Sequence, residues 1–329
     1  MSEARNQPDR LTVSVVVPTY RRPEFVRECL RHLSALRTPP TEALVVDASP
    51  DDRTRAVVGE WPGVTYLRND LGASTTPESR NIGLQAATGD VVAFVDDDAY
   101  VDPDWLDELI SCYADPEVFG VGGRIVNGQS GEDREGLDRI GRLLPDGRLM
   151  GYFAADPGRV IDVDHLLGAN MSFRRAALSD VGGVHGGYPG PCICEETDIS
   201  LRQRALGRRL VFNPRAVVRH VSAPYAIKGD RFDRRWHFYA RRNQQAMFIR
   251  VFGLGSPYPA RLAGTLLREL KMRCAYVARA LAGRVPELDH RGRLRSPAIV
   301  LRSVIELSGL VVGTAAGIPQ RRSELQEKQ

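Results

Sequence analysis

The sequence predicts an α/β protein with a mostly parallel sheet flanked by helices, followed by a helical C-terminal region. Between residues 11 and 96, β-branched apolar segments alternate with amphipathic helical segments, which is the pattern of a parallel sheet covered on both faces. Beyond about residue 222 the pattern becomes helical and rich in arginine. The chain has 329 residues, 43% of them hydrophobic, and is therefore long enough to bury a full core and carry a smaller appendage.

The elements of the first part follow in order along the chain. A strand is expected at 11–20, where Pro18 should stop it, and a helix at 22–36, where Phe25, Val26, Cys29, Leu30 and Leu33 recur at helical spacing. Two further strands are expected at 42–52 and 63–69, then a helix at 77–89, then a strand that ends at Asp96. The side chains at the carboxyl ends of these parallel strands, Tyr20, Asp47 and Asp96, should meet at one edge of the sheet.

The alternation is interrupted after about residue 115. Residues 119–126 predict a strand, 127–160 a long loop or lid, and 166–183 a strand followed by a helix. Residues 194–221 predict a helix with an acidic start that ends near Gly207, and then two short strands around Pro214.

The C-terminal region predicts three helices, at 234–253, 258–283 and 296–317. Arg302 and Glu306 interrupt the apolar run of the third, and an arginine near the centre of a spanning helix costs about 2.5–3.5 kcal/mol on insertion scales. This helix is therefore expected to pack on the protein or to lie on a membrane surface. We expect a loose tail at 1–10, an α/β domain at 11–222 and a basic helical region at 223–329.

The charge of the chain is unevenly distributed. Residues 1–222 carry 25 Lys and Arg against 33 Asp and Glu, whereas residues 223–329 carry 20 against 8. This asymmetry suggests a part that binds nucleotide and metal joined to a basic part that meets an anionic membrane surface, with no nucleic-acid partner. The polar start shows no secretory pattern, and five cysteines without paired spacings fit a reducing compartment. A cytoplasmic location follows as an expectation.

Three consecutive aspartates, Asp96, Asp97 and Asp98, directly follow the apolar strand VVAFV. Two carboxylates about 4 Å apart repel each other by roughly 1–4 kcal/mol, depending on the local dielectric, so a cation should offset the crowding. The alternative is a solvated turn, because aspartate is common where strands stop. Carboxylate oxygens are the ligands that Mg²⁺ and Mn²⁺ prefer, and such an ion could stabilise a diphosphate leaving group.

Five motifs occur in an order and spacing that resemble family 2 glycosyltransferases of the GT-A fold. They are VVVPTYRR, LVVDASPDD, ESRNIGLQAATGDVVAFVDDDA, GANMSFRR and EETDISLRQRALG, and they cover residues 11–222. The resemblance implies a nucleotide-diphosphate sugar donor, with a UDP- or dTDP-sugar favoured, a divalent cation (Mg²⁺ or Mn²⁺) and inversion at the anomeric carbon. The acceptor would be a glycan, a lipid-linked glycan or a small molecule.

The resemblance also implies roles for individual residues. The nucleotide would be bound by Pro18, Thr19, Tyr20, Asp47, Arg80, Asp96 and Asp97. Asp98, together with Asp96 and His220, would hold the metal. Glu195, Asn170 and Arg242 would face the sugar or the acceptor. Ordinary packing is the alternative for Tyr20 and His220, and a turn after Gly168 is the alternative for Asn170.

An inverting transfer also needs a base for the attacking hydroxyl. Family members usually carry Glu-Asp where this chain has Glu195 and Glu196, so the resemblance assigns the base to Glu196, one methylene longer than usual. The alternative is that Glu195, Glu196 and Asp198 only stabilise the start of a helix.

Two other classes of protein share some of these features. A nucleotidyltransferase also combines paired acids with a metal, but the sequence has no glycine-rich phosphate loop with a lysine near its first strand. A non-catalytic metal-binding protein is the second alternative, although the aspartates lack the ligand spacing of an EF-hand loop. Cys192 and Cys194 resemble half of a zinc site but have no second ligand pair at suitable spacing.

Overall fold

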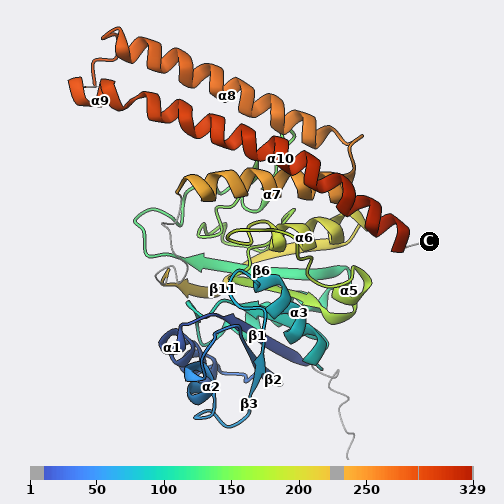
Figure 1. Ribbon diagram of the computed structural model, residues 1–329. Coiled ribbons are helices and arrows are strands. Elements are labelled where there is room, and N and C mark those ends of the chain that lie inside the picture. Colours follow the sequence, from blue (N-terminus) through green and yellow to red (C-terminus); the bar gives the residue numbers. More distant parts are fainter. Residues whose placement is uncertain (1–10, 223–232, 288, 328–329) are drawn as a thin grey trace, which may run out of the picture. The chain divides into compact units, whose positions relative to one another are not determined.

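The computed structural model describes residues 11–222, 233–287 and 289–327, and Figure 1 shows its helices and strands. The chain divides into two compact units. The first holds the chain up to Arg142, Gly151–Gly186 and Ile199–Ala226; the second holds Leu143–Met150, Gly187–Asp198 and the chain from Ile227. The predicted tail at 1–10 lies outside the described residues.

The second unit includes two short segments that were expected to belong to the α/β domain at 11–222. Side-chain amides of the C-terminal helices hold both segments: Gln244 Nε2 donates to the Gly147 carbonyl at 2.8 Å, and Asn243 Nδ2 donates to the Pro189 and Ile193 carbonyls at 3.2 Å. These bonds satisfy loop carbonyls that would otherwise lack partners, which explains why the segments group with the helices.

The first unit is built on one nine-stranded mixed sheet, with strand order β3-β2-β1-β4-β10-β6-β11-β5 and β9 paired to β11. The strands β1 to β4, β6 and β11 run in one direction, and β5, β9 and β10 run in the other. The sheet is therefore mostly parallel, as predicted. Its strands are β1 (Val13–Thr19), β2 (Glu42–Asp47), β3 (Val64–Arg68), β4 (Val91–Val95), β5 (Ala99–Val101), β6 (Val118–Val126), β9 (Ile161–Asp162), β10 (Asn170–Arg174) and β11 (Arg209–His220).

Helices flank this sheet and cover its apolar side chains. They are α1 (Pro23–Ser34), α2 (Arg53–Val58), α3 (Thr76–Ala86), α4 (Trp105–Ser111), the short 3₁₀ helix η1 (Cys112–Ala114), α5 (Arg175–Asp180) and most of α6 (Glu195–Ala205). Helix α1 buries Val26, Cys29, Leu30 and Leu33 as its spacing predicts, whereas Phe25 is half-buried. Strands β1 and β4 are buried along their whole length, so their carboxyl ends are held rigidly.

Several elements differ from the sequence prediction. Strand β1 continues past Pro18 to Thr19, and Pro18 stays in register with Val46 of β2. The two strands expected around Pro214 are one strand, β11, whose pairing with β6 shifts register between Asn213 and Val217, because proline has no N–H for the ladder. The expected loop at 127–160 contains the short paired strands β7 (Arg142–Leu143) and β8 (Leu149–Met150). The short elements α2, α4 and β5 were not predicted.

The second unit is mainly helical, with α7 (Arg234–Phe252), α8 (Pro257–Leu281), α9 (His290–Arg295) and α10 (Pro297–Glu327). Figure 1 shows α10 running alongside α8 and across α7. Three glycines of α10, Gly309, Gly313 and Gly317, face the backbone of α7, where an added Cβ would meet carbonyl oxygens at 2.4, 2.3 and 2.9 Å. These glycines therefore permit a close helix pair that larger residues would separate.

Candidate active site

The register of the sheet gathers several predicted site residues in the first unit. Strand β1 lies between β2 and β4, and Thr19 at the end of β1 pairs directly with Asp47 at the end of β2. Strand β4 ends at Val95, so Asp96, Asp97 and Asp98 emerge beside the end of β1. The carboxyl ends of three parallel strands thus meet as the sequence predicts.

The middle aspartate of the triplet points into the protein. Asp97 is 3% exposed, accepts a hydrogen bond from Thr19 Oγ1 at 2.6 Å and forms an ion pair with Arg22 Nη1 at 3.1 Å. Burial raises the pKa of Asp97 to about 7, although Arg22 and Thr19 act against the rise. The same guanidinium lies 3.5 Å from Asp98 Oδ2. Arg22 therefore offsets part of the repulsion that the triplet creates, a role that the sequence analysis did not assign to it.

The outer two aspartates come together with His220. Strand β5 pairs antiparallel with β11, which places His220 opposite Ala99, and His220 Nε2 lies 3.3 Å from Asp98 Oδ1. Asp96 is held by Arg80, whose Nη2 donates to Asp96 Oδ1 at 3.0 Å. Within the described residues, Asp96, Asp98 and His220 form the one group of three such side chains with a ligand atom each inside 4.8 Å of one another.

This donor set suits a small divalent cation. Two carboxylates and one imidazole offer hard oxygen ligands and a borderline nitrogen, the combination that accommodates Mg²⁺ or Mn²⁺. Asp98 is 6% exposed and Asp96 keeps about a third of its side chain accessible, so the group can receive an ion from solvent. The residues present therefore fit the metal that the sequence implies.

The remaining predicted nucleotide residues lie at the same strand ends. Pro18 and Thr19 are buried, and Tyr20 is half-buried with the Arg21 guanidinium 5.4 Å from its ring centre. Asp47 is fully buried, and its two carboxylate oxygens accept bonds from the Ser49 amide at 2.8 Å and the Tyr66 hydroxyl at 3.1 Å. A contact between Asp47 and a nucleobase stays a prediction.

Arg80 is more deeply placed than the sequence analysis expected. Its side chain is 2% exposed, lies over the Phe94 ring and donates to the Gly168 carbonyl at 3.2 Å in addition to Asp96. In this position the guanidinium orients Asp96, while direct contact between Arg80 and a base or diphosphate stays a prediction.

Asn170 has a structural role that the sequence did not predict. Its side chain accepts from Trp105 Nε1 at 2.9 Å and donates to the Arg124 and Ala216 carbonyls at 3.1 and 2.9 Å. The residue is 1% exposed, so it joins β10 to neighbouring segments inside the sheet. Contact between Asn170 and a sugar or acceptor stays a prediction.

The acidic start of α6 belongs to the second unit. Glu195 is buried, whereas Glu196 is half-buried and is the more accessible of the two adjacent carboxylates. Cys192 and Cys194, just before them, adopt φ angles of 55° and 82°. Non-glycine residues with positive φ are uncommon and cluster at functional sites. Accessibility and local backbone strain both favour Glu196 as a functional side chain.

Asp198 anchors this turn to α7 through a buried ionic group. Arg250, 2% exposed, pairs with Asp198, which is fully buried and also accepts from the Tyr188 hydroxyl. Arg250 Nη2 lies 3.3 Å from that hydroxyl oxygen and so binds both partners. From the sequence alone Asp198 is only a helix-start acid, because nothing local indicates a partner more than fifty residues away.

Replacing Arg250 by methionine should destabilise the protein strongly. The variant Arg250→Met would leave the buried Asp198 charge without its arginine, and removal of one member of a buried pair typically costs about 3–5 kcal/mol. Urea unfolding measures the loss. The exposed Arg279→Met is the matched control, expected within about 0.5 kcal/mol of wild type. Adding Asp198→Asn to Arg250→Met should recover part of the loss, and a single-variant loss below about 1 kcal/mol would contradict the ionic account.

Arg242 lies on α7 in the same unit as Glu196. Its Nη1 donates to the Gly187 carbonyl at 2.9 Å and to Asn243 Oδ1 at 3.1 Å. Burial lowers the pKa of Arg242 from its usual value, with Tyr188 and Tyr239 acting in the opposite direction. The guanidinium thus orders the segment that leads into α6, and its contact with a sugar or acceptor stays a prediction.

Comparison with known proteins identifies the family. The family model described as glycosyl transferase family 2 matches residues 14–182, about half of the chain. The chain is a family 2 glycosyltransferase. This glycosyltransferase is 30% identical over 254 residues to the glucosyl-dolichyl phosphate glucuronosyltransferase of Haloferax volcanii, with 72% of this chain and 79% of the relative covered. It is also 30% identical over 220 residues to the pre-mycofactocin glycosyltransferase of Mycobacterium tuberculosis, spanning 65% of this chain and 43% of that relative.

Solved structures confirm the GT-A fold of this glycosyltransferase. A mannosyltransferase of Pyrobaculum calidifontis, solved with GDP-Man and Mn²⁺, superposes with a TM-score of 0.60 at 18% identity and covers 94% of this chain and 87% of that one. The TarS protein of S. aureus, solved with UDP-GlcNAc, gives a TM-score of 0.52 at 17% identity over 97% and 93% of the two chains. At these identities the likeness concerns the fold alone.

Proposed function

We propose that this glycosyltransferase moves a sugar from a UDP- or dTDP-sugar to an acceptor hydroxyl, with inversion and with the help of a divalent cation. The observation that carries the proposal is the group of Asp96, Asp98 and His220 at the ends of β4 and β11. The alternatives of a nucleotidyltransferase and of a non-catalytic metal-binding protein are not favoured, because the chain belongs to a family of sugar-transferring enzymes.

In this proposal Asp98, Asp96 and His220 hold Mg²⁺ or Mn²⁺. The ion would act as a Lewis acid toward the negative charge that grows on the diphosphate as the glycosidic bond breaks. Arg80 fixes the direction of the Asp96 carboxylate, and Arg22 compensates the charge of Asp97 and Asp98. Holding these groups in place before the donor binds avoids reorganisation during the reaction.

The nucleotide would occupy the strand ends. Pro18, Thr19 and Tyr20 at the end of β1 would line the base and ribose, with Asp47 of β2 beside them, and Asp96 would bind the ribose. Our choice of uridine or thymidine over guanosine rests on the sequence resemblance. The UDP-GlcNAc complex of TarS agrees with this choice, and the GDP-Man complex of the Pyrobaculum calidifontis protein marks guanosine as the main competitor.

Glu196 would be the base that accepts the proton of the attacking hydroxyl. A carboxylate that is only partly buried at a helix start can be reached by an acceptor, and a glutamate can accept a proton as an aspartate does. Glu195 directly precedes Glu196 in the chain, and Arg242 lies in the same unit. Both residues would contact the sugar or the acceptor.

We propose that the acceptor is lipid-linked and that the enzyme acts in glycan or polysaccharide biosynthesis. The name of the Haloferax volcanii relative gives glucosyl-dolichyl phosphate as the molecule on which that protein acts, and that relative covers most of this chain. A lipid-linked acceptor would require the enzyme to work at a membrane, so we propose a cytoplasmic enzyme at the inner membrane face.

A thermal-shift screen tests the donor assignment. With Mn²⁺ present, UDP or dTDP should stabilise the chain and GDP should not, because a ligand at 100 times its dissociation constant adds about 2.7 kcal/mol to the free energy of unfolding. Release of nucleoside diphosphate from the sugar nucleotide in the presence of acceptor then measures transfer. Stabilisation by GDP alone would contradict the choice of base, and release of pyrophosphate would indicate nucleotidyl transfer.

A further inference from the structure

The C-terminal helix α10 has an unusual exposed surface. The segment His290–Arg321 is long and apolar enough to cross a membrane by length and composition, yet only 28% of its most apolar window is buried. The core helix of a soluble protein would bury most of such a window. We therefore expect a partner to cover the exposed apolar side of α10.

The exposed side of α10 is a continuous stripe, which we call the outer stripe. Its members are Leu301, Val304, Ser308, Val311, Val312 and Ala315. They recur at three, four and seven residues, the spacing of one helix face, and span about 21 Å at 1.5 Å per residue. Val311 is 68% exposed and Val304 50%, and Leu301 and Val312 are also exposed, so four large apolar side chains of the stripe face solvent.

The two charged residues that interrupt the sequence of α10 do not interrupt this stripe. Glu306 is 2% exposed and lies on the inner side, where Arg302 Nε bonds it at 3.2 Å and Arg273 Nη1 at 3.4 Å. Arg302 keeps about half its side chain exposed, but its guanidinium is engaged with Glu306. The outer stripe consequently carries no charge, a fact that the linear sequence conceals.

The segments that precede α10 in the chain carry many exposed basic side chains. From residue 257 to residue 321 the chain has eleven Lys and Arg against four Asp and Glu. The exposed cations are Arg261, Arg268, Lys271, Arg279, Arg284, Arg291 and Arg295. An apolar face combined with an excess of exposed cations is the pattern of a helix that lies in the interface of an anionic membrane.

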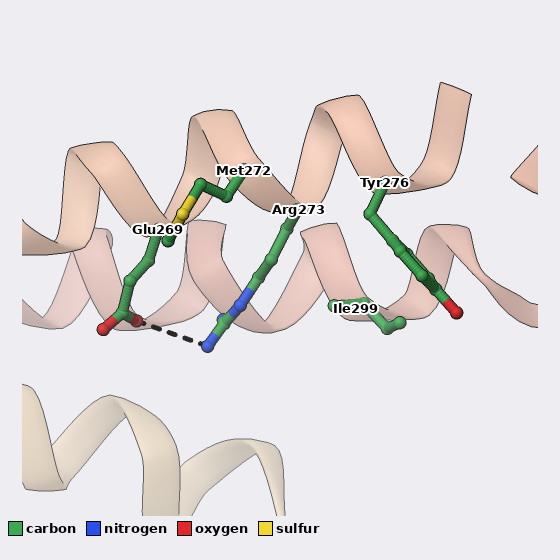
Figure 2. Close-up of a pocket in the computed structure, with 5 residues that line it drawn as sticks. All are labelled: Glu269, Met272, Arg273, Tyr276 and Ile299. Atoms are coloured by element: carbon green, nitrogen blue, oxygen red, sulfur yellow. Dashed lines mark hydrogen bonds and ion pairs between the residues drawn. The ribbon is translucent and has the colours of Figure 1, made fainter. Parts of the chain in front are cut away.

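A hollow between α8 and α10 adds apolar surface next to these cations. It measures about 450 Å³ and is lined by Glu269, Met272, Arg273, Tyr276 and Ile299. Figure 2 shows four of these side chains on α8 and Ile299 on α10, with Arg273 directed toward Glu269. Arg273 Nη2 lies 3.3 Å from Glu269 Oε2. Met272 is 64% exposed, and tyrosine is enriched where protein meets the lipid headgroups.

We propose that the outer stripe of α10 docks on an anionic lipid bilayer. Because its inner side packs against α7 and α8, α10 lies along the bilayer and does not cross it. The apolar side chains enter the headgroup region, and the exposed cations of α8 and α9 bind lipid phosphates. This surface deepens the proposed action on a lipid-linked acceptor, although the docking itself requires neither donor nor transfer.

Cosedimentation of the full chain with vesicles tests the proposal. The chain should bind vesicles of equal parts phosphatidylglycerol and phosphatidylcholine, bind phosphatidylcholine alone more weakly, and release from the anionic vesicles as salt rises. The double variant Val304→Glu/Val311→Glu should lower the bound fraction by about tenfold or more, because charges on the inserted face oppose burial in lipid. The variant Leu206→Glu is the matched control, since Leu206 is 58% exposed on the first unit and should leave binding unchanged.

Two further measurements keep the result interpretable. Circular dichroism melts establish that the double variant is folded, and light scattering reports the oligomeric state without vesicles. No binding by wild type at low salt, or equal binding by the folded double variant, overturns the proposal. If wild type does not bind vesicles but forms a dimer, and the double variant is a monomer, the stripe binds a second copy of this chain. That result also overturns the proposal. Since these measurements use no sugar donor, their outcome is separate from that of the transfer assay.

Discussion

The variant Asp98→Ala should lose metal-dependent transfer by about 10²- to 10³-fold, because the cation contributes several kcal/mol to the stabilisation of the leaving group. Asp98 is the central member of the proposed metal group: His220 lies 3.3 Å from it and Asp96 is its other close neighbour. Alanine leaves His220 and Asp96 as the remaining ligands, too few to hold the ion firmly. Rates of diphosphate release measured against Mn²⁺ concentration give the effect.

Two readouts separate a metal role from a structural one. The Mn²⁺ concentration needed for half-maximal activity should rise in Asp98→Ala, whereas the fold, followed by circular dichroism, should persist because Arg22 still pairs with Asp97. The matched control is Asp104→Ala on the same segment, whose carboxylate is about half exposed and pairs with Arg37 outside the site. Unchanged activity with wild-type Mn²⁺ dependence in Asp98→Ala would remove Asp98 from the metal site.

Much of the fold could be predicted because the signals are local. The strands β1, β2, β3 and β4 and the helices α1 and α3 follow from apolar periodicity and from proline and glycine at their ends. The carboxyl ends of parallel strands lie at one edge of a sheet, which grouped Tyr20, Asp47 and Asp96 without any knowledge of distances. Short elements such as α2 and β5 were not predicted, because a segment of so few residues is too short to show a hydrophobic periodicity.

The finer arrangement of the site depends on contacts between distant residues. Arg250 meets Asp198 across 52 positions, and Asn170 is bound by Trp105 across 65, so no local pattern could indicate either pairing. The same holds for Glu306: in the sequence its charge interrupts an apolar helix, and in the structure it is buried and pairs with Arg273 and Arg302. The residue types indicated which side chains could bind a ligand or react. Only the tertiary packing distinguishes the polar side chains that are buried in structural contacts from those that a ligand can reach.

The variant Glu196→Gln should lower the turnover number by about 10²- to 10⁴-fold and leave nucleotide binding near that of wild type. The amide keeps the size of the side chain but cannot accept a proton at neutral pH, so the attacking hydroxyl loses its base. Glu196 suits this role because it is only partly buried, whereas the adjacent Glu195 is 3% exposed. Steady-state kinetics with acceptor, combined with the thermal shift produced by the nucleoside diphosphate, measure the two quantities separately.

Two matched variants make this test specific. Glu196→Asp restores a carboxylate one methylene shorter, the residue usual for the family at this position, and should recover a substantial part of the turnover that Glu196→Gln loses. If Glu195→Gln abolishes turnover while Glu196→Gln stays near wild type, the base is Glu195. In that case the accessibility of a carboxylate does not predict which of the two glutamates is the base.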